Sequence, residues 1–327
     1  MSSASAPGKI ILFGEHAVVY GRPALAIPVT QVGVTVAIQI TSTNNEIPDI
    51  PSQSNQDWKE RISIFAPAIH RSGVLASYDS SRKADPIGMV IENVVKELEI
   101  NSPPSLHIDI SSSIPVSSGF GSGAAVSVAL VRALAATFGR TIPDEKVSQI
   151  AFEAEKLHHG TPSGIDNTVV TYARPVYFIK DKPIQTFAVG APFTLVIADS
   201  GIRAATRESV GDVRRLWLAN PQRFEDIFTE IAAIVETARR AIQQGDEEEL
   251  GELMNQNHRF LQELTVSSPL LDHLKQAALN AGASGAKLSG GGRGGNLIAL
   301  VSSETIDCVA TALGRAGARQ IIITTVI

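Results

Sequence analysis

The 327-residue sequence has very little cysteine and no strongly basic stretch. With Cys308 as the only cysteine, it has no internal disulfide and no cysteine-based zinc site, and it suits a reducing compartment, the cytoplasm. We expect Cys308 to be an inert core residue. The 28 basic and 33 acidic residues give a formal net charge of −5 without a Lys/Arg-rich run, so we expect no nucleic-acid partner.

Long hydrophobic runs are absent as well. The most apolar segment, residues 124–138, is interrupted by Arg132 and is shorter than the roughly 20 residues that span a bilayer, so it predicts a buried helix and no membrane partner. The apolar stretch at residues 10–13 is too short for a signal peptide, so we expect no export signal. A hydrophobic share of 44% with 19% charged residues predicts a folded protein, and the length favours two domains.

The hydrophobic pattern predicts helices and strands in both halves of the chain. Alternation at residues 32–41 and 106–110 is typical of half-buried strands, and the polar stretch 42–57 predicts a loop. Other expected elements are strands at 170–179, 194–199, 296–301 and 320–326, and helices at 223–244 and 247–264. This mixture predicts an α+β fold with mostly antiparallel sheets, divided into domains 1–182 and 183–327.

Two glycine-rich segments are candidate ligand-binding loops. Residues 115–125 (PVSSGFGSGAA) open onto the apolar helix, where free N–H groups and the helix dipole favour a phosphate; an ordinary glycine-capped loop has the same composition. Residues 287–296 (KLSGGGRGGN) precede a strand. Their glycines indicate positive φ angles or a close approach to a ligand or to another backbone, although a tight turn needs only one or two of them.

Two further segments place polar side chains beside turns. Glu155 lies in a helical stretch and Asp166 in the Gly/Pro-containing turn after it, so they can serve as a magnesium ligand and a base, or simply be solvated at a helix end. Near the N-terminus, an apolar strand has Lys9 at its start and Glu15 and His16 at its exit. Taken alone, such a lysine is usually solvated and such a histidine usually belongs to the core.

In this order and at these separations, the four segments resemble the GHMP kinase superfamily and, within it, the mevalonate kinases. The opening PGKIILFGEHAVVYG is similar to the mevalonate kinase form; galactokinases carry a GEH-T-D-Y variant, and mevalonate-diphosphate decarboxylases lack the GEH element. The stretches HHGTPSGIDN and KLSGGGRGGN resemble two other superfamily motifs. Together the motifs span nearly the whole chain.

The resemblance implies a two-domain α+β fold, with an N-terminal domain like ribosomal protein S5 domain 2 and a ferredoxin-like C-terminal domain. It implies that ATP is bound between them and phosphorylates the 5-hydroxyl of mevalonate to 5-phosphomevalonate, in isoprenoid precursor biosynthesis. Mg²⁺ is the implied cofactor. A homodimer is the implied assembly.

The resemblance also implies roles for individual residues. Asp166 matches the catalytic aspartate, and Lys9 its partner, which lowers the effective pKa of the alcohol. Glu155 matches a magnesium ligand, with Ser122 as the candidate second one. The implied mevalonate-binding residues are Glu15, His16 and Thr206. The implied ATP-binding residues are Pro115, Ser117, Ser118, Gly119, Gly121, Ser122, Gly123 and Ala124.

Two positions depart from the family pattern. Gly123 replaces the second serine of the usual Gly-Ser-Ser-Ala-Ala, so either Ser122 or water completes the magnesium shell. Arg293 interrupts the second glycine run and can place a guanidinium near a phosphate or the substrate carboxylate. We predict that Arg293→Ala raises the apparent KM for ATP or mevalonate more than about tenfold.

Other functions stay open at this point. Arg203 and Arg207, close to Thr206, keep a phosphomevalonate kinase among the alternatives, because such an enzyme needs extra cations around its acceptor. A mevalonate 3-kinase acting on the same skeleton is a second alternative. The missing serine at position 123 also leaves room for a catalytically impaired nucleotide-binding homologue.

Overall fold

The computed structural model of the chain describes residues 1–41, 57–79, 85–115, 119–159, 162–183, 185–204 and 206–327. The chain forms two compact units that interleave along the sequence. Unit 1 consists of Met1–Gly8, Val32–Val116 and Gly121–Tyr172. Unit 2 consists of Lys9–Gln31, Ser117–Phe120 and Ala173–Ile327. The division into two continuous domains, 1–182 and 183–327, therefore stays a prediction.

Unit 1 contains the strands that the alternating pattern predicts. The second part of β2 (Ala24–Ile40) pairs antiparallel with β5 (Leu106–Ser112), and Val34, Val36 and Ile38 are fully buried. β3 (Ile62–Ala66) pairs parallel with β5 and antiparallel with β4 (Arg71–Val74). Within the described residues, these pairings confirm the expectation of mostly antiparallel sheets, although β3 and β5 run parallel. The predicted loop 42–57 lies, apart from residue 57, outside the described residues.

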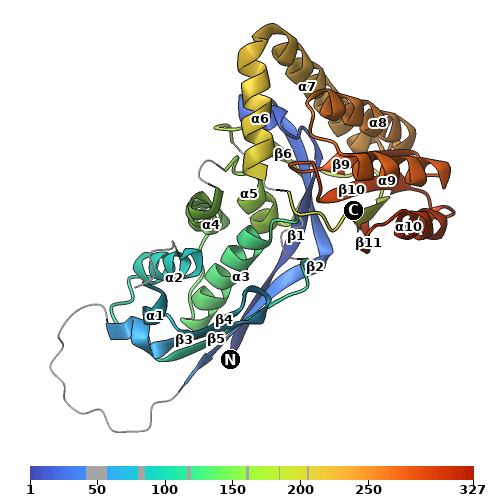
Figure 1. The fold of residues 1–327 in the computed structure, drawn as a ribbon. Helices are drawn as coiled ribbons and strands as arrows, with labels where there is room; N and C mark the ends of the chain where they lie inside the picture. Colours follow the sequence, from blue (N-terminus) through green and yellow to red (C-terminus); the bar gives the residue numbers. More distant parts are fainter. Residues whose placement is uncertain (42–56, 80–84, 116–118, 160–161, 184, 205) are drawn as a thin grey trace, which may run out of the picture. The chain divides into compact units, whose positions relative to one another are not determined.

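Helices of unit 1 pack on one another next to these strands (Figure 1). They are α2 (Pro86–Glu97), α3 (Ser122–Thr137), α4 (Asp144–His159) and α5 (Ile165–Tyr172). Buried residues lie on nearly every side of α3, which confirms the buried helix expected there. Short elements are η2 (Asp57–Arg61), η3 (Pro67–Ile69) and α1 (Ala76–Asp79).

The strand expected at residues 170–179 is wrong in its first part. Tyr172 ends α5, and only Val176–Phe178 form a strand, β6. Val169, Val170 and Thr171 favour a strand by their branched side chains, but all three are buried where α5 packs against α3 and α4. Tertiary packing here overrides the local preference.

Unit 2 contains a four-stranded antiparallel sheet with the order β11-β8-β10-β9. Its strands are β8 (Phe193–Asp199), β9 (Gly285–Ser289), β10 (Asn296–Val301) and β11 (Gln320–Val326). Helices precede β9, and α10 (Ile306–Arg315) connects β10 to β11. This βαββαβ succession, with its first strand between the third and the last, is the ferredoxin-like arrangement that the resemblance implies.

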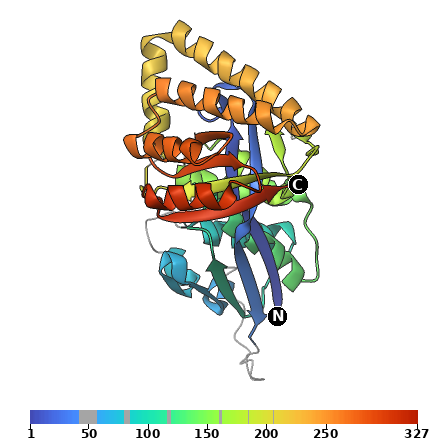
Figure 2. The same ribbon diagram turned by 90° about the vertical axis from the view of Figure 1, so that its right-hand side faces the viewer.

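In unit 2, side chains cap the start of several helices. Asn220, Asp246 and Ser268 each accept a hydrogen bond from a backbone N–H in the first turn of the helix that follows. The helices are α6 (Thr206–Ala219), α7 (Pro221–Gln244), α8 (Glu247–Glu263) and α9 (Pro269–Asn280). The helices expected at 223–244 and 247–264 are confirmed. In Figure 2, α9 and α10 lie beside the sheet, in agreement with their contacts to its strands.

The N-terminal segment of unit 2 supplies further strands. β1 (Ser2–Phe13) ends there, and the start of β2 pairs antiparallel with β6, which pairs with β7 (Gln185–Thr186). Between β1 and β2 lies η1 (Ala17–Tyr20), whose Tyr20 ring stacks on Phe228 of α7 with centroids 4.3 Å apart. This contact holds the Gly-Glu-His turn against the helices of unit 2.

Two surface features complete the fold. Cys308 is exposed on α10, so its expected place in the core is wrong: α10 buries Val309 and Leu313 on its other side. Among the residues that the structure describes, no helix is both long and apolar enough to cross a membrane.

Candidate active site

The start of α3 in unit 1 leaves backbone N–H groups available. Gly121 stands before the helix at φ 69 without a side-chain cap, and Ala125 N–H, bonded to the Gly121 carbonyl at 3.0 Å, makes the first helical hydrogen bond. The amides of Ser122, Gly123 and Ala124 therefore have no acceptor within the helix. Gly123 is exposed, and a Cβ added there meets no atom within 4 Å. This helix start is suited to an anion.

Not all of the predicted phosphate loop is described. Ser117 and Ser118 lie outside the described residues. Pro115 belongs to unit 1 and Gly119 to unit 2. The remaining predicted residues, from Gly121 to Ala124, lie at the α3 start.

The two predicted carboxylates of unit 1 stand on neighbouring helices. Glu155 is buried on α4, and Asp166 lies partly exposed in the first turn of α5, where the helix dipole favours a negative charge. The next residue, Asn167, is buried and donates from Nδ2 to the Ser148 hydroxyl at 2.8 Å, which anchors α5 to α4. Asp166 therefore projects from a fixed helix start.

A second tie connects α5 to the phosphate-loop helix. Arg132 of α3 donates from Nη2 to the Thr171 carbonyl oxygen at 2.6 Å. Because α3, α4 and α5 all contact one another, Ser122, Glu155 and Asp166 are carried by one packed helix cluster. The sequence places these three residues within 45 positions, and the fold of unit 1 assembles their helices.

In unit 2, the N-terminal motif is buried. Lys9 is 4% exposed, against the usual position of such a lysine, and its backbone N–H donates to the Phe120 carbonyl at 2.9 Å. Glu15 is 1% exposed and forms an ion pair with the fully buried Lys287. Burial raises the pKa of Glu15 and lowers the pKa of Lys287, and the attraction between the two charges opposes both shifts.

His16 is held in its neutral form. Burial lowers the pKa of His16 from 6.5 to about 4. Its Nε2 donates a hydrogen bond to the Gly291 carbonyl at 3.1 Å, and this bond opposes the shift. With Nε2 as the donor, Nδ1 is an acceptor. Within the described part of the chain, His16 Nδ1 and the second carboxylate oxygen of Glu15, Oε2, are buried without a hydrogen-bond partner. Two adjacent residues thus offer acceptors to a hydroxylated ligand.

The second glycine-rich segment packs against other parts of unit 2. Gly292 has φ 75, and a Cβ there would overlap the Val266 carbonyl oxygen; a Cβ on Gly294 would lie 2.5 Å from the Ile202 carbonyl oxygen. Backbone bonds follow the same contacts, from Arg293 N–H to the Val266 carbonyl at 2.7 Å and from Gly295 N–H to the Ile202 carbonyl at 3.0 Å. At these positions, the glycines allow a close approach of another backbone.

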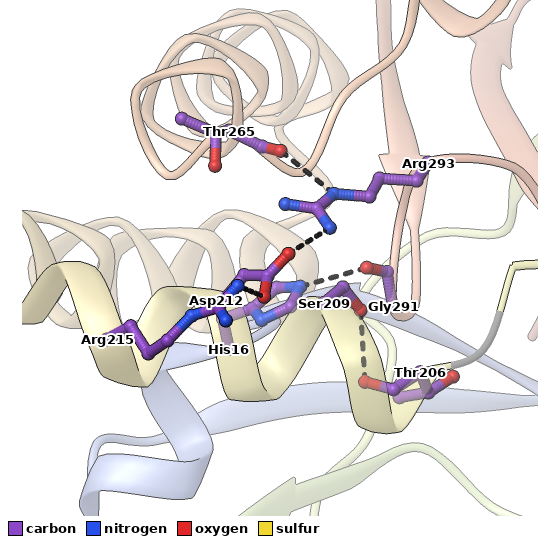
Figure 3. A network of polar contacts seen from close by, with 8 residues as sticks. All are labelled: His16, Thr206, Ser209, Asp212, Arg215, Thr265, Gly291 and Arg293. Carbon is purple, nitrogen blue, oxygen red and sulfur yellow. Dashed lines mark hydrogen bonds and ion pairs between the residues drawn. The ribbon is translucent and has the colours of Figure 1, made fainter.

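This segment also contacts the start of α6 (Figure 3). A Cβ on Gly291 would lie 2.8 Å from the Thr206 hydroxyl oxygen, so Thr206 lies directly beside Gly291. The carbonyl of Gly291 is the one that His16 contacts. Arg293 donates to the Asp212 carboxylate of α6 and, at 3.2 Å, to the Thr265 carbonyl. Glu15, His16 and Thr206 are thus linked through the segment 287–296.

Sequence reasoning missed Lys287 and Asp212. Lys287 is 272 positions from its partner Glu15, and Asp212 is 81 positions from Arg293. Lys287 opens the glycine-rich motif, but nothing in its neighbourhood distinguishes a buried lysine from a solvated one. In the sequence, nothing distinguishes Asp212 from the other charged residues of its helix.

Comparisons with known proteins agree with these features. Residues 87–174 match the GHMP kinases N terminal domain and residues 220–319 the GHMP kinases C terminal domain. A mevalonate kinase of Thermococcus sibiricus is 35% identical, with 98% of this chain and 94% of the relative covered. The crystal structure of L. major mevalonate kinase in complex with R-mevalonate has a TM-score of 0.79 and 31% identity, and covers 100% of this chain and 96% of that chain.

A further solved structure extends the likeness in fold. The Methanococcus jannaschii mevalonate kinase has a TM-score of 0.81 at 24% identity, covering 99% of this chain and 96% of that one. The match to both family domains and the near-complete coverage of a relative at 35% identity establish the family. The two-domain fold expected from the sequence is confirmed. This chain belongs to the GHMP kinases and, among them, to the mevalonate kinase family.

Proposed function

We propose that this protein transfers the γ-phosphoryl group of ATP to the 5-hydroxyl of mevalonate and releases 5-phosphomevalonate and ADP. The observation that carries the proposal is the 31% identity, over the whole chain, to a mevalonate kinase whose crystal structure contains R-mevalonate. The buried acceptors on Glu15 and His16 support it, because a small hydroxy acid has hydroxyl groups that can donate to them.

Unit 2 supplies the acceptor side of the proposed reaction. Glu15 Oε2 and His16 Nδ1 accept hydrogen bonds from mevalonate, and Thr206 adds a hydroxyl at the start of α6. Because His16 is neutral above about pH 4, Nδ1 keeps its acceptor role over the physiological range. A protonated His16 would lose that acceptor.

The start of α3 and the loop before it supply the donor side of the proposed reaction. The uncapped start of α3 binds the phosphates of ATP through the amides of Ser122, Gly123 and Ala124. Pro115, Ser117, Ser118, Gly119 and Gly121 complete the proposed ATP-binding set. Positioning and charge neutralisation, more than covalent chemistry, accelerate phosphoryl transfer, and backbone amides provide both.

The side chains proposed for Mg²⁺ fit that ion. Glu155 offers a carboxylate and Ser122 a hydroxyl, both hard oxygen ligands, from helices that contact each other. When bound, Mg²⁺ neutralises charge on the transferring phosphate. Gly123 has no side-chain ligand, so Ser122 or water fills the remaining position.

Asp166 and Lys9 act on the attacking hydroxyl. The Asp166 carboxylate accepts a hydrogen bond from the 5-hydroxyl and takes its proton as the bond to phosphorus forms. The Lys9 ammonium stabilises the charge that develops on that oxygen and lowers the effective pKa of the alcohol. Asp166 belongs to unit 1 and Lys9 to unit 2, so the proposal requires both units in one reaction.

The test is to measure ADP release with mevalonate, phosphomevalonate, galactose and homoserine in parallel. We expect turnover with mevalonate, with ³¹P NMR of the product showing a primary phosphate ester at the 5-position. A tertiary 3-phosphate identifies a mevalonate 3-kinase, and turnover of phosphomevalonate alone identifies a phosphomevalonate kinase. Nucleotide binding without turnover of any substrate indicates an impaired homologue. Each of these results contradicts the proposal.

We also propose that the enzyme is a cytoplasmic homodimer. The single cysteine of the sequence suits a reducing compartment, and the family resemblance implies a homodimer. Light scattering after size-exclusion chromatography tests the assembly: a mass of twice 34.6 kDa is expected, and a mass of 34.6 kDa would contradict it.

A further inference from the structure

Arg293 makes contacts that the proposed chemistry does not require. The backbone of Arg293 has φ 59, a left-handed conformation that residues other than glycine rarely adopt. Glycines flank Arg293 on both sides in the sequence, yet this position has a side chain. Its guanidinium has two partners in the protein, the Asp212 carboxylate and the Thr265 carbonyl. A strained backbone that carries a specific ion pair suggests that the ion pair has a function.

The ion pair connects two structures that carry proposed acceptor-binding residues. Asp212 lies on α6, which begins at Thr206. Arg293 lies two residues after Gly291, whose carbonyl accepts a hydrogen bond from His16. A Cβ on Gly291 would lie 2.8 Å from the Thr206 hydroxyl oxygen. The Arg293–Asp212 pair, drawn in Figure 3, thus joins α6 to the glycine-rich segment at a second place, beside the approach of Thr206 to Gly291.

The same carboxylate provides an internal comparison. Asp212 also binds Arg215, one turn further along α6, but the Arg215 side chain is 77% exposed and this pair stays within one helix. The Arg293 side chain is 34% exposed. The hydrogen bond from Arg293 is the largest cause that lowers the pKa of Asp212, so this carboxylate is ionised at neutral pH. One arginine bridges two elements, and the other is local.

We propose that the Arg293–Asp212 ion pair is a positioning latch, which holds the start of α6 and the Gly291 carbonyl in the arrangement that Thr206 and His16 need to bind the acceptor alcohol. The latch rests on the proposed function for its link to mevalonate. Arg293 acts through Asp212 and the segment that follows Gly291, without touching the substrate. It therefore sets acceptor affinity, and it leaves ATP affinity and the chemical step nearly unchanged.

The test is a double-mutant cycle of Arg293→Met and Asp212→Asn. We expect each single variant to raise the KM for mevalonate about tenfold, with kcat and the KM for ATP within about twofold, and the double variant to resemble either single one. Arg293→Lys keeps the charge and should recover part of the loss. Arg215→Met, the matched control on the same carboxylate, should have wild-type kinetics.

Several results would overturn the latch. If Arg293→Met raises the KM for mevalonate and Asp212→Asn does not, Arg293 contacts the substrate directly. If the two losses add in the double variant, the residues act separately. An unchanged KM in Arg293→Met removes the role altogether. Should Arg293→Met fail to fold, Arg293→Gly takes its place in the cycle, because glycine tolerates the backbone conformation.

Hydrogen exchange separates the latch from the proposed function. In the protein without substrate, amides in residues 206–212 should exchange faster in Arg293→Met and Asp212→Asn than in wild type, and at the wild-type rate in Arg215→Met. Unchanged exchange in all variants contradicts the latch whatever the substrate is. A wild-type protein that does not phosphorylate mevalonate contradicts the proposed function. The exchange data then still show whether the Arg293–Asp212 pair holds the start of α6.

Discussion

The two glycine-rich segments look alike in the sequence but differ in their surroundings. At the start of α3, Gly123 is exposed with open space at its α-carbon, and the neighbouring amides lack helical acceptors. In the segment 287–296, Gly292 and Gly294 lie against the backbone of Val266 and Ile202. A glycine cluster therefore has no single meaning: at Gly292 and Gly294 the protein's own backbone approaches, whereas the α-carbon of Gly123 faces open space, where we propose that a ligand binds.

A similar contrast separates Asp166 of unit 1 from Glu15 and His16 of unit 2. In unit 1, Asp166 projects partly exposed from a helix start. In unit 2, Glu15 and His16 are buried and bonded to the glycine-rich segment. Substitution of Asp166 should therefore affect the reaction with little loss of stability, whereas substitution of Glu15 or His16 should affect both.

The largest expected effect is on the reaction alone. Asp166→Asn should lower kcat by at least about a hundredfold, because it removes the proposed base, while ATP still binds. Its thermal unfolding midpoint should stay close to wild type, since the side chain is partly exposed. Steady-state kinetics and nucleotide binding by calorimetry check both statements. A variant that keeps a tenth of the wild-type kcat would show that the assigned role is wrong.

The buried ion pair should give the largest effect on stability. Lys287→Met leaves the Glu15 carboxylate buried without its cation and should lower the free energy of unfolding by about 3–5 kcal/mol. The control is Lys156→Met, which removes an exposed partner of Glu153 and should cost less than about 1 kcal/mol. Urea titration measures both. Equal losses in the two variants would contradict the expected difference between a buried and an exposed ion pair.

Serine substitutions compare the two glycine-rich segments directly. Gly292→Ser should lower the free energy of unfolding by more than about 2 kcal/mol, because of its positive φ and the overlap with the Val266 carbonyl. Gly123→Ser should stay within about 0.5 kcal/mol of wild type, since it restores a side chain in open space at a helix start. If Gly123→Ser destabilises as much as Gly292→Ser, the first segment is packed too.

Gly123→Ser also tests the metal shell. It restores the serine that the family pattern has at this position and should lower the Mg²⁺ concentration needed for half-maximal activity if water now fills that place. An unchanged Mg²⁺ dependence would indicate that Ser122 already supplies the ligand.

A further expected effect is a pH dependence of stability that arises in unit 2. Burial lowers the pKa values of His16 and His258 from 6.5 to about 4, so both are neutral in the folded state. The unfolded chain takes up these protons first as the pH falls. Their contribution to stability is therefore complete above about pH 6.5 and is lost between pH 6.5 and 4. Unfolding midpoints from pH 7.5 to 4.5 should decline, less steeply in His258→Gln; an equally steep decline would contradict this cause.

Much of the fold follows from local sequence. The alternation that ends at Ile40 and the apolar helix after Gly121 reflect periods that a strand and a helix impose on any chain, and both elements lie where expected. The same local information gave the wrong structure for residues 170–172 and the wrong exposure for Cys308. Those depend on which neighbours an element packs against, and the local pattern does not contain that.

The candidate site was predictable as a set of motifs, and its contacts were not. The order of the motifs identifies the family and the residue types it uses. The contact of Glu15 with Lys287, or of Arg293 with Asp212, joins residues far apart in the chain. Such contacts follow only from the tertiary fold. The interpretation of Arg293 changes accordingly. The sequence suggests a cation near the substrate, and the structure shows a guanidinium that binds Asp212 and Thr265 of the protein.

The most direct test of the account is a crystal structure of the protein with a non-hydrolysable ATP analogue and mevalonate bound. The account predicts that the 5-hydroxyl lies within about 3 Å of both the Asp166 carboxylate and the Lys9 ammonium, with the γ-phosphate at the start of α3. Mevalonate bound away from Glu15 and His16, or an Asp166 side chain turned away from the hydroxyl, would contradict it.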